Sequence, residues 1–452
     1  MKMKNLLLIL CMITCTLAAS AQEILDVEPG EGTLNAAIAT HQGNKVYRLQ
    51  NGYNGYYVLS EIINNTGFEL TIIGGGDPDA DDPDPTRPPT LQTSGTGGTP
   101  FSYMFQAYEN ITLEDIYFVN ATADGVFNNG YFMQIAGNNV KASINNCILD
   151  PAGNPVYVTG NNASVFITNS LLNILTNQTT SVNGPVNFYF ANQEYGLDTL
   201  FLENNSMIGL STALFSDGNA DVKTDFVWIN HNTFMHHKCQ IDWMTNVEEF
   251  YFTNNLLYDS HVIPYERAWV GGWDKYPAGV GAVSELLWSH ASPSVKENGE
   301  FIEWGFDKMT SFVANNIEFK NQQFIDNLDL LYTWAQEKGA PISMYFQPLV
   351  WTPDAPAYGI ILDTALANNP QASIYNSTEY PNWKAANNKY DINPTFTDHR
   401  IDSLSAILAE WALPATKNDY FGAYYDGGTD FTSLNWYWDP DGNIGQNETW
   451  PL

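Results

Sequence analysis

A base, a carboxylate and two cations lie within one stretch of the chain: Lys238, Asp242, Arg267 and Lys275. These residue types suit β-elimination from a uronate sugar, in which a base removes the C5 proton while a cation neutralises the sugar carboxylate. Lys238 would be the base, Arg267 or Lys275 its cationic partner, and Asp242 the ligand of a metal ion. Asp242 lies four residues from Lys238, on the same face of an extended segment, and would raise its pKa, which works against a base.

Asp242 also suits a second reaction, the hydrolysis of a glycosidic bond. An inverting hydrolase holds two carboxyl groups roughly 6.5–9.5 Å apart, so that a water molecule fits between them. Asp259 or Glu266 would supply the second carboxyl group. From these residues alone, elimination and hydrolysis both remain open.

Three extended segments, 155–159, 186–190 and 237–243, alternate apolar residues with polar and aromatic ones. Successive side chains of a strand point to opposite faces, so the apolar set would face inward and the polar set outward. An outer face of this composition suits sugars, which offer both hydroxyls and apolar ring faces; a plain solvated face is the alternative. The candidate substrate-binding residues are Tyr157, Asn187, Tyr189, His236 and Gln240.

A tryptophan-rich segment follows at 262–304, and we expect it to be a loop insertion. Trp269 and Trp273 would stack on sugar rings if the loop borders the groove. The alternative is a small core in which both rings pack against the rest of the chain.

A recurring sequence pattern predicts the element that would position these residues. At seven places an apolar residue and a strand-like segment surround an Asn or Asp corner: Asp115, Asn146, Asn169, Asn205, Asn232, Asn255 and Asn316, at spacings of 31, 23, 36, 27, 23 and 61 residues. Such repetition predicts stacked coils of β-strands. Asn tolerates the left-handed conformation that a sharp corner needs. The longest gap would hold one large insertion, or an extra coil and a smaller insertion.

With these corners the chain resembles right-handed parallel β-helix proteins of the pectate-lyase-like superfamily, over roughly residues 23–320. The resemblance implies an all-β solenoid with a ladder of stacked Asn side chains at one corner. It also implies that the first sheet of each coil and its flanking loops form the substrate groove, with the three extended segments as first strands. The Arg motif of pectate lyases and the paired-Asp motif of polygalacturonases are not evident, and this architecture hosts lyases, hydrolases and adhesins alike.

The chain divides into three parts. Residues 1–21 have a basic start, a short apolar run and an Ala-Ser-Ala cleavage site, which predict a signal peptide and a secreted or cell-surface protein. Residues 22–320 would form the β-helix, with a short helix at 32–39 plugging the end before the first coil. Residues 321–452 are helical and aromatic in pattern, and we expect them to cap the β-helix. The C-terminal end resembles the segment before a type IX sorting domain of secreted Bacteroidota proteins.

The chain carries 18 Lys and Arg against 50 Asp and Glu, a formal net charge of −32. This balance disfavours nucleic acid, anionic membranes and, without bridging cations, anionic polysaccharides. Asp77, Asp79 and Asp81 lie in a proline-rich loop whose density of oxygen ligands suits Ca²⁺. These three are the candidate metal ligands, and a solvated acidic loop is the alternative. No apolar run after the leader is long enough to cross a bilayer.

Two functions follow from these patterns. The first is a secreted polysaccharide-active protein, a lyase or a glycoside hydrolase, acting in an outer-face groove. The second is a non-catalytic adhesive or glycan-binding β-helix, which the missing family motifs favour. Cys147 and Cys239 would be buried free thiols, because coils that far apart hold them beyond disulfide reach.

Overall fold

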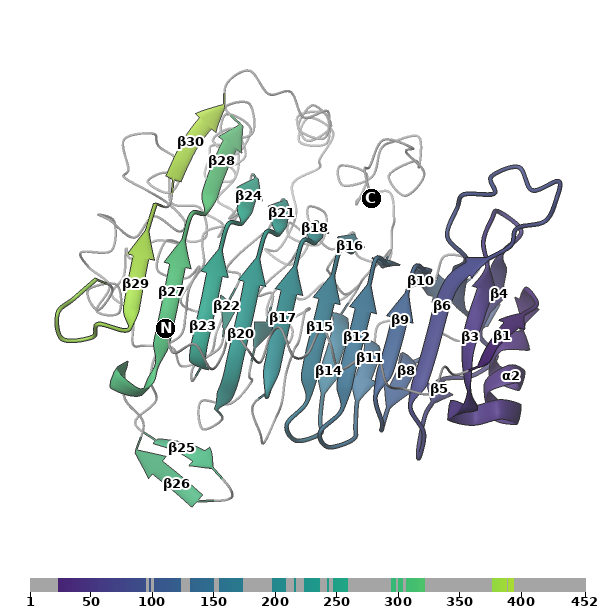
Figure 1. Ribbon diagram of the computed structural model, residues 1–452, viewed down its shortest axis with the longest axis horizontal. Helices are drawn as coiled ribbons and strands as arrows, with labels where there is room; N and C mark the ends of the chain where they lie inside the picture. Colours follow the sequence, from purple (N-terminus) through teal and green to yellow (C-terminus); the bar gives the residue numbers. More distant parts are fainter. Residues whose placement is uncertain are drawn as a thin grey trace, which may run out of the picture.

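The computed structural model describes residues 23–94, 97–98, 101–122, 131–149, 154–173, 197–208, 215–216, 223–235, 242–243, 247–258, 294–297, 300–303, 306–321, 376–387 and 389–393. These residues form stacked β-coils whose strands build two long parallel sheets (Figure 1). The predicted all-β parallel solenoid is confirmed. In this part of the chain no helix is long and apolar enough to cross a membrane.

Two parallel sheets, A and B, each receive one strand from every coil. Sheet A orders β1 (Glu23–Val27), β3 (Lys45–Gln50), β6 (Leu70–Gly76), β9 (Ile111–Glu114), β12 (Lys141–Asn145), β15 (Ser164–Thr168), β17 (Thr199–Glu203), β20 (Thr224–Asn230), β23 (Val247–Thr253), β27 (Thr310–Ala314) and β29 (Trp383–Ala386). Sheet B orders β2 (Gly30–Glu31), β4 (Tyr56–Val58), β7 (Thr90–Ser94), β10 (Tyr117–Thr122), β13 (Ile148–Leu149), β16 (Leu171–Asn173), β18 (Ser206–Ile208), β21 (Thr233–Met235), β24 (Leu256–Tyr258), β28 (Ile317–Asn321) and β30 (Lys389–Asn393).

A shorter third sheet, C, lies behind sheet A in Figure 1. Its strands are β5 (Ile63–Asn64), β8 (Tyr103–Ala107), β11 (Tyr131–Ile135) and β14 (Asn154–Val158). Each follows a sheet B strand and precedes a sheet A strand, as predicted for the first strand of a coil. The parallel pair β19 (Phe215–Ser216) and β22 (Asp242–Trp243) takes the same place in two later coils. A separate antiparallel hairpin consists of β25 (Ser294–Glu297) and β26 (Glu300–Glu303).

The core fills the space between the sheets with the inward side chains of each strand. In β15, buried Val165 and Ile167 alternate with part-exposed neighbours, which is the period of a strand buried on one face. Phe105, Phe118 and Phe132 from sheets B and C pack edge to face, with ring centroids 4.9–5.9 Å apart. This burial of apolar surface is the main force that holds the coils together.

The corner between sheets A and B has two adjacent positions with different roles. The first is exposed and left-handed, with φ of 52–59°, and holds Asp115, Asn146, Asn169, Asn204, His231, Asn254, Asn315 and Asn387. The second is buried and holds Ile116, Cys147, Ser170, Asn205, Asn232, Asn255 and Asn316. The spacing predicted from the sequence was wrong at one step, because it equated Asn169 with Asn205. Asn169 corresponds to Asn204, since Thr168 pairs with Glu203 in the strands before the corner.

The buried position forms the predicted Asn ladder. The Oδ1 atom of Asn232 accepts from the backbone N–H and the side-chain amide of Asn205, both at 3.0 Å. Its Nδ2 donates to the carbonyl of Leu202 at 3.0 Å. The same pattern joins Asn232 to Asn255 and Asn255 to Asn316. The coils that carry Asn205, Asn232, Asn255 and Asn316 are therefore tied to one another by hydrogen bonds between buried groups, which are costly to leave unpaired.

Cys147 occupies this ladder position in an earlier coil. Its backbone N–H donates to the hydroxyl of Ser170 at 3.1 Å, which continues the ladder with a shorter side chain. The thiol is free and fully buried, as predicted, and burial raises its pKa to about 12. Cys239 lies outside the described residues.

The two ends of the solenoid each differ from the prediction in one respect, and the longest gap is also resolved. Strands β1 and β2 precede helix α2 (Thr33–His41), so the helix does not come before the first coil. Of the two alternatives left open for the longest gap, the extra coil is excluded and the single large insertion remains, because β23 pairs directly with β27 and β24 with β28. Strands β29 and β30 extend both sheets past residue 320, where the β-helix was predicted to end.

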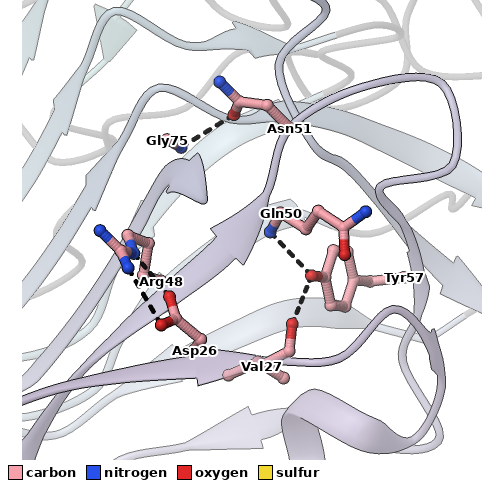
Figure 2. A network of polar contacts seen from close by, with 7 residues as sticks. All are labelled: Asp26, Val27, Arg48, Gln50, Asn51, Tyr57 and Gly75. Atoms are coloured by element: carbon pink, nitrogen blue, oxygen red, sulfur yellow. Dashed lines mark hydrogen bonds and ion pairs between the residues drawn. The ribbon is translucent and has the colours of Figure 1, made fainter. Parts of the chain in front are cut away.

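A network of polar contacts joins the first coils (Figure 2). The Tyr57 hydroxyl donates to the carbonyl of Val27 at 2.6 Å and accepts from the backbone N–H of Gln50 at 2.9 Å. Arg48 forms two hydrogen bonds with the Asp26 carboxylate, at 2.6 and 3.0 Å. Because Tyr57 is fully buried, the pKa of its phenol rises to about 12 and the hydroxyl stays protonated.

Candidate functional site

The outer face of sheet C carries a column of polar side chains, one from each strand. Asn64, Gln106, Gln134 and Tyr157 are in register across β5, β8, β11 and β14. Asn64 is exposed and the other three are half-buried. The column therefore lies on the outside of the solenoid and runs across the strands, along the direction in which the coils stack.

A break in the alternation of β8 and β11 widens this face. Each strand has two consecutive buried residues, Met104 and Phe105 in β8 and Phe132 and Met133 in β11. Tyr103 and Gln106 are therefore both partly exposed on one strand, three residues apart, and so are Tyr131 and Gln134 on the next. The face thus gains a second column, of aromatic rings.

The three tyrosines of this face stack on one another. The rings of Tyr103 and Tyr131 have centroids 6.1 Å apart, those of Tyr131 and Tyr157 are 4.5 Å apart, and both pairs are inclined by 17°. Burial, with a smaller contribution from Tyr157, raises the pKa of Tyr103. Its hydroxyl therefore remains a neutral donor and acceptor at physiological pH.

The amides of the polar column form a ladder of their own. Asn64 Nδ2 donates to Gln106 Oε1 at 3.2 Å, and Gln106 Nε2 donates to Gln134 Oε1 at 2.7 Å. Gln134 Nε2 donates to the hydroxyl of Thr159 at 3.4 Å. A carboxamide has two N–H donors and two acceptor lone pairs, and within the described residues the ladder uses one of each on both glutamines. Each glutamine thus retains one donor and one acceptor for a ligand.

Sequence reasoning located this face from one of its strands. Tyr157 and Thr159 point outward while Val156 and Val158 are buried, as the alternation predicted. Asp242 lies in β22, in the coil position of a sheet C strand. The other predicted residues lie outside the described residues: Asn187, Tyr189, His236, Lys238, Gln240, Arg267, Trp269 and Trp273.

The acidic loop at residues 77–89 is held to the first coils by Asp82. Its carboxylate accepts from the backbone N–H groups of Tyr53 and Asn54, both at 2.9 Å. Asp77, Asp79 and Asp81 lie on the same loop, but the described residues contain no group of three acidic, His or Cys side chains that could hold a metal ion. The structure thus gives these three carboxylates no common ligand position.

A second outer surface, on sheet A, was missed by sequence reasoning. We define the aromatic row as Phe166, Phe201, Trp228, Tyr251 and Phe312, which are in register on five neighbouring strands. Each lies three residues before the left-handed corner residue of its coil. Because of that constant spacing, the aromatic row could have been recognised from the sequence. It was overlooked because only the expected first strands of the coils were considered for binding.

The chain matches no protein-family model and no curated protein. The chemistry of the two outer faces is therefore the basis on which a function is assigned.

Proposed function

We propose that this protein is a polysaccharide-binding β-helix whose glycan lies across the strands of sheet C. The amide ladder beside the tyrosine stack is the observation that carries the proposal. Spare amide donors and acceptors match pairs of sugar hydroxyls, and the tyrosines add apolar ring surface and phenol hydroxyls. Both columns follow the stacking direction, so a linear polymer can meet the same groups coil after coil.

The expected ligand is a neutral glycan. The described outer positions of sheet C are tyrosines, amides and a threonine, none of them charged at neutral pH. The chain as a whole has a formal net charge of −32, which repels uronate polymers. A neutral chain suffers no such repulsion.

A second candidate is catalysis at the continuation of this face, by glycoside hydrolysis or β-elimination. The position of Asp242 in β22 favours it, because that strand takes the place of a sheet C strand in its coil. Lys238 and Arg267 would complete the elimination site, and Asp259 or Glu266 the hydrolytic pair.

The wider proposal keeps four further features of the sequence. The chain would be a secreted or surface member of the pectate-lyase-like superfamily, exported through its leader at 1–21. Helix α2, which buries Leu34 and Ile38 in the core, would plug the first coils. The residues after β28 would cap the C-terminal end of the solenoid, except for β29 and β30, which form a further coil. Calcium at Asp77, Asp79 and Asp81 stays a prediction that a titration would test.

A polysaccharide panel tests the proposal. Purified chain would be run in native gels containing neutral or uronate polymers, and each incubation would be assayed for unsaturated products and new reducing ends. We expect retardation by at least one neutral polymer. Retardation without products identifies a binding protein, whereas products that Asp242→Asn abolishes identify the enzyme. Retardation by uronate polymers alone, or by no polymer, would contradict the proposal.

A further inference from the structure

The aromatic row is a continuous, partly exposed surface along sheet A, the sheet at the front of Figure 1. Its neighbouring rings have centroids 5.5–6.4 Å apart. Phe226, two residues before Trp228, widens the row at its centre with a ring 6.4 Å from that of Trp228. Core packing does not explain these rings, because the inward residues of the same strands, such as Val227 and Ile229, already fill the core.

A polar row runs parallel to the rings, two residues closer to the corners. It consists of Asn145, Thr168, Glu203, Asn230 and Thr253. Its members are joined across the strands: Asn230 Nδ2 donates to Glu203 at 2.7 Å, and Thr253 donates to Asn230 Oδ1 at 2.8 Å. Asn230 and Thr253 are buried, so the half-buried Asn145, Thr168 and Glu203 are the members that face a ligand beside the rings.

The central ring of the row carries an unused donor. The indole N–H of Trp228 is shielded from water and has no hydrogen-bond partner in the described part of the chain. An unsatisfied donor of this kind costs free energy that a ligand acceptor would recover. Because water cannot reach this N–H, a ligand oxygen would meet it only if the indole turns outward, and Trp228→Phe tests that contribution.

Charge and periodicity decide what kind of partner fits. Glu203 and Glu249, which accepts from the Tyr251 hydroxyl at 3.2 Å, border the middle of the row and repel an anionic polymer there. Among the described contacts, the only lysine over a ring of the row is Lys141, 4.7 Å from the centroid of Phe166 at one end. A second copy of this chain would bring another net charge of −32 against the first. The row itself repeats once per strand, at about 4.8 Å. A neutral linear polymer fits this surface because it has no charge for the carboxylates to repel and because its own units repeat along the row.

We propose that the aromatic row of sheet A is a second binding surface for a neutral polysaccharide chain, separate from the face on sheet C. Apolar faces of the sugars lie on the rings, and their hydroxyls meet the half-buried members of the polar row, Asn145, Thr168 and Glu203. The two surfaces belong to different sheets, so one molecule holds two glycan chains and cross-links them. This surface does not depend on the sheet C face for its own binding.

Isothermal titration with soluble neutral oligosaccharides, drawn from linear glucan, xylan and mannan, tests this on the full purified chain. The variants are Trp228→Ala and Phe201→Ala on sheet A, with Thr112→Ala as a matched control on the same sheet outside the row. Trp228→Phe keeps a ring and removes only the N–H. Circular dichroism and the unfolding midpoint would establish that each variant is folded.

We expect two binding events in the wild type. Trp228→Ala and Phe201→Ala should each weaken one of them by about tenfold or more, which is about 1.4 kcal/mol, and leave the other unchanged. Trp228→Phe should give a smaller loss, and Thr112→Ala none. If folded Trp228→Ala and Phe201→Ala bind every oligosaccharide as the wild type does, the second surface is refuted.

The outcomes also separate this inference from the proposed function. If Tyr131→Ala on sheet C removes all binding, the row is not a glycan site while the sheet C proposal stands. If Trp228→Ala removes all binding and Tyr131→Ala none, the row stands and the sheet C proposal falls. Concentration-dependent dimerisation that Trp228→Ala abolishes would assign the row to a second copy of the chain and overturn the inference.

Discussion

Asparagine has two distinct uses at the corners of this protein, and they explain why its side chains recur. In the exposed position Asn254 adopts a φ of 56°, which Asn tolerates better than most residues. In the buried position Asn255 is a cross-link between coils. His231 shows that the exposed position accepts another residue, whereas Cys147 and Ser170 show that the ladder can continue with shorter side chains.

Removing one ladder amide should destabilise the protein. Asn232→Ala leaves the backbone N–H of Asn205 and the carbonyl of Leu202 without their buried partners. We expect a loss of about 3 kcal/mol in the free energy of unfolding, measured by urea denaturation. Thr233→Ala, at the next and half-buried residue, should cost less than about 1 kcal/mol. Equal losses in the two variants would show that the ladder is not a special source of stability.

The strands and corners could be predicted at the level of elements because their residue types are local signals. Alternation identified β14, and the recurring Asn pattern identified the corners. Other features were hidden by long-range pairing. The strands β29 and β30 lie far in sequence from the corner at Asn315, and nothing local says that they join β27 and β28.

The candidate site was predicted only in part, for a similar reason. Tyr157 was found because β14 alternates cleanly. Tyr103 and Tyr131 were missed because two consecutive buried residues interrupt the alternation of their strands. The aromatic row was missed although its rings lie three residues before each corner, because only the expected first strands of the coils were considered for binding.

Helix α2 provides a prediction at the scale of elements. Leu34 and Ile38 are its buried apolar residues, and both belong to the main core cluster. Leu34→Ala should cost about 3 kcal/mol, as other buried large-to-small changes do, if the helix plugs the first coils. Limited proteolysis should then cut the first coils before the later ones. The exposed change Ala36→Ser is the control, and equal protease resistance in the two variants would refute the plug.

The stability of the whole molecule depends on pH through carboxyl groups whose pKa values are shifted in the folded state. Burial raises the pKa of Asp225, and burial together with Asp115 raises that of Glu114. Such groups bind protons more tightly in the folded state, so folding gains stability as the pH falls through their raised pKa values. Hydrogen bonds from Lys45 and Arg48 lower the pKa values of Glu23 and Asp26, and that stability is lost at lower pH, as these groups protonate.

We therefore predict a maximum of thermal stability near about pH 5, because protonation also relieves the repulsion among carboxylates. Melting temperatures measured by circular dichroism between about pH 3 and 8 would show it. In Glu114→Gln the melting temperature should rise less as the pH falls from neutral, because a carboxyl group with a raised pKa has been removed. A melting temperature that falls steadily from neutral to pH 5 would contradict this account.

The central claim is that the amide and tyrosine columns of sheet C bind a neutral glycan. It is tested most directly by titrating the best neutral oligosaccharide into Tyr131→Ala/Gln134→Ala and into Tyr56→Ala, whose tyrosine is 39% exposed on sheet B. We predict that the sheet C double variant, once shown to be folded, loses at least about tenfold in affinity at one site while Tyr56→Ala binds as the wild type does. Unchanged binding by the folded double variant would contradict the claim.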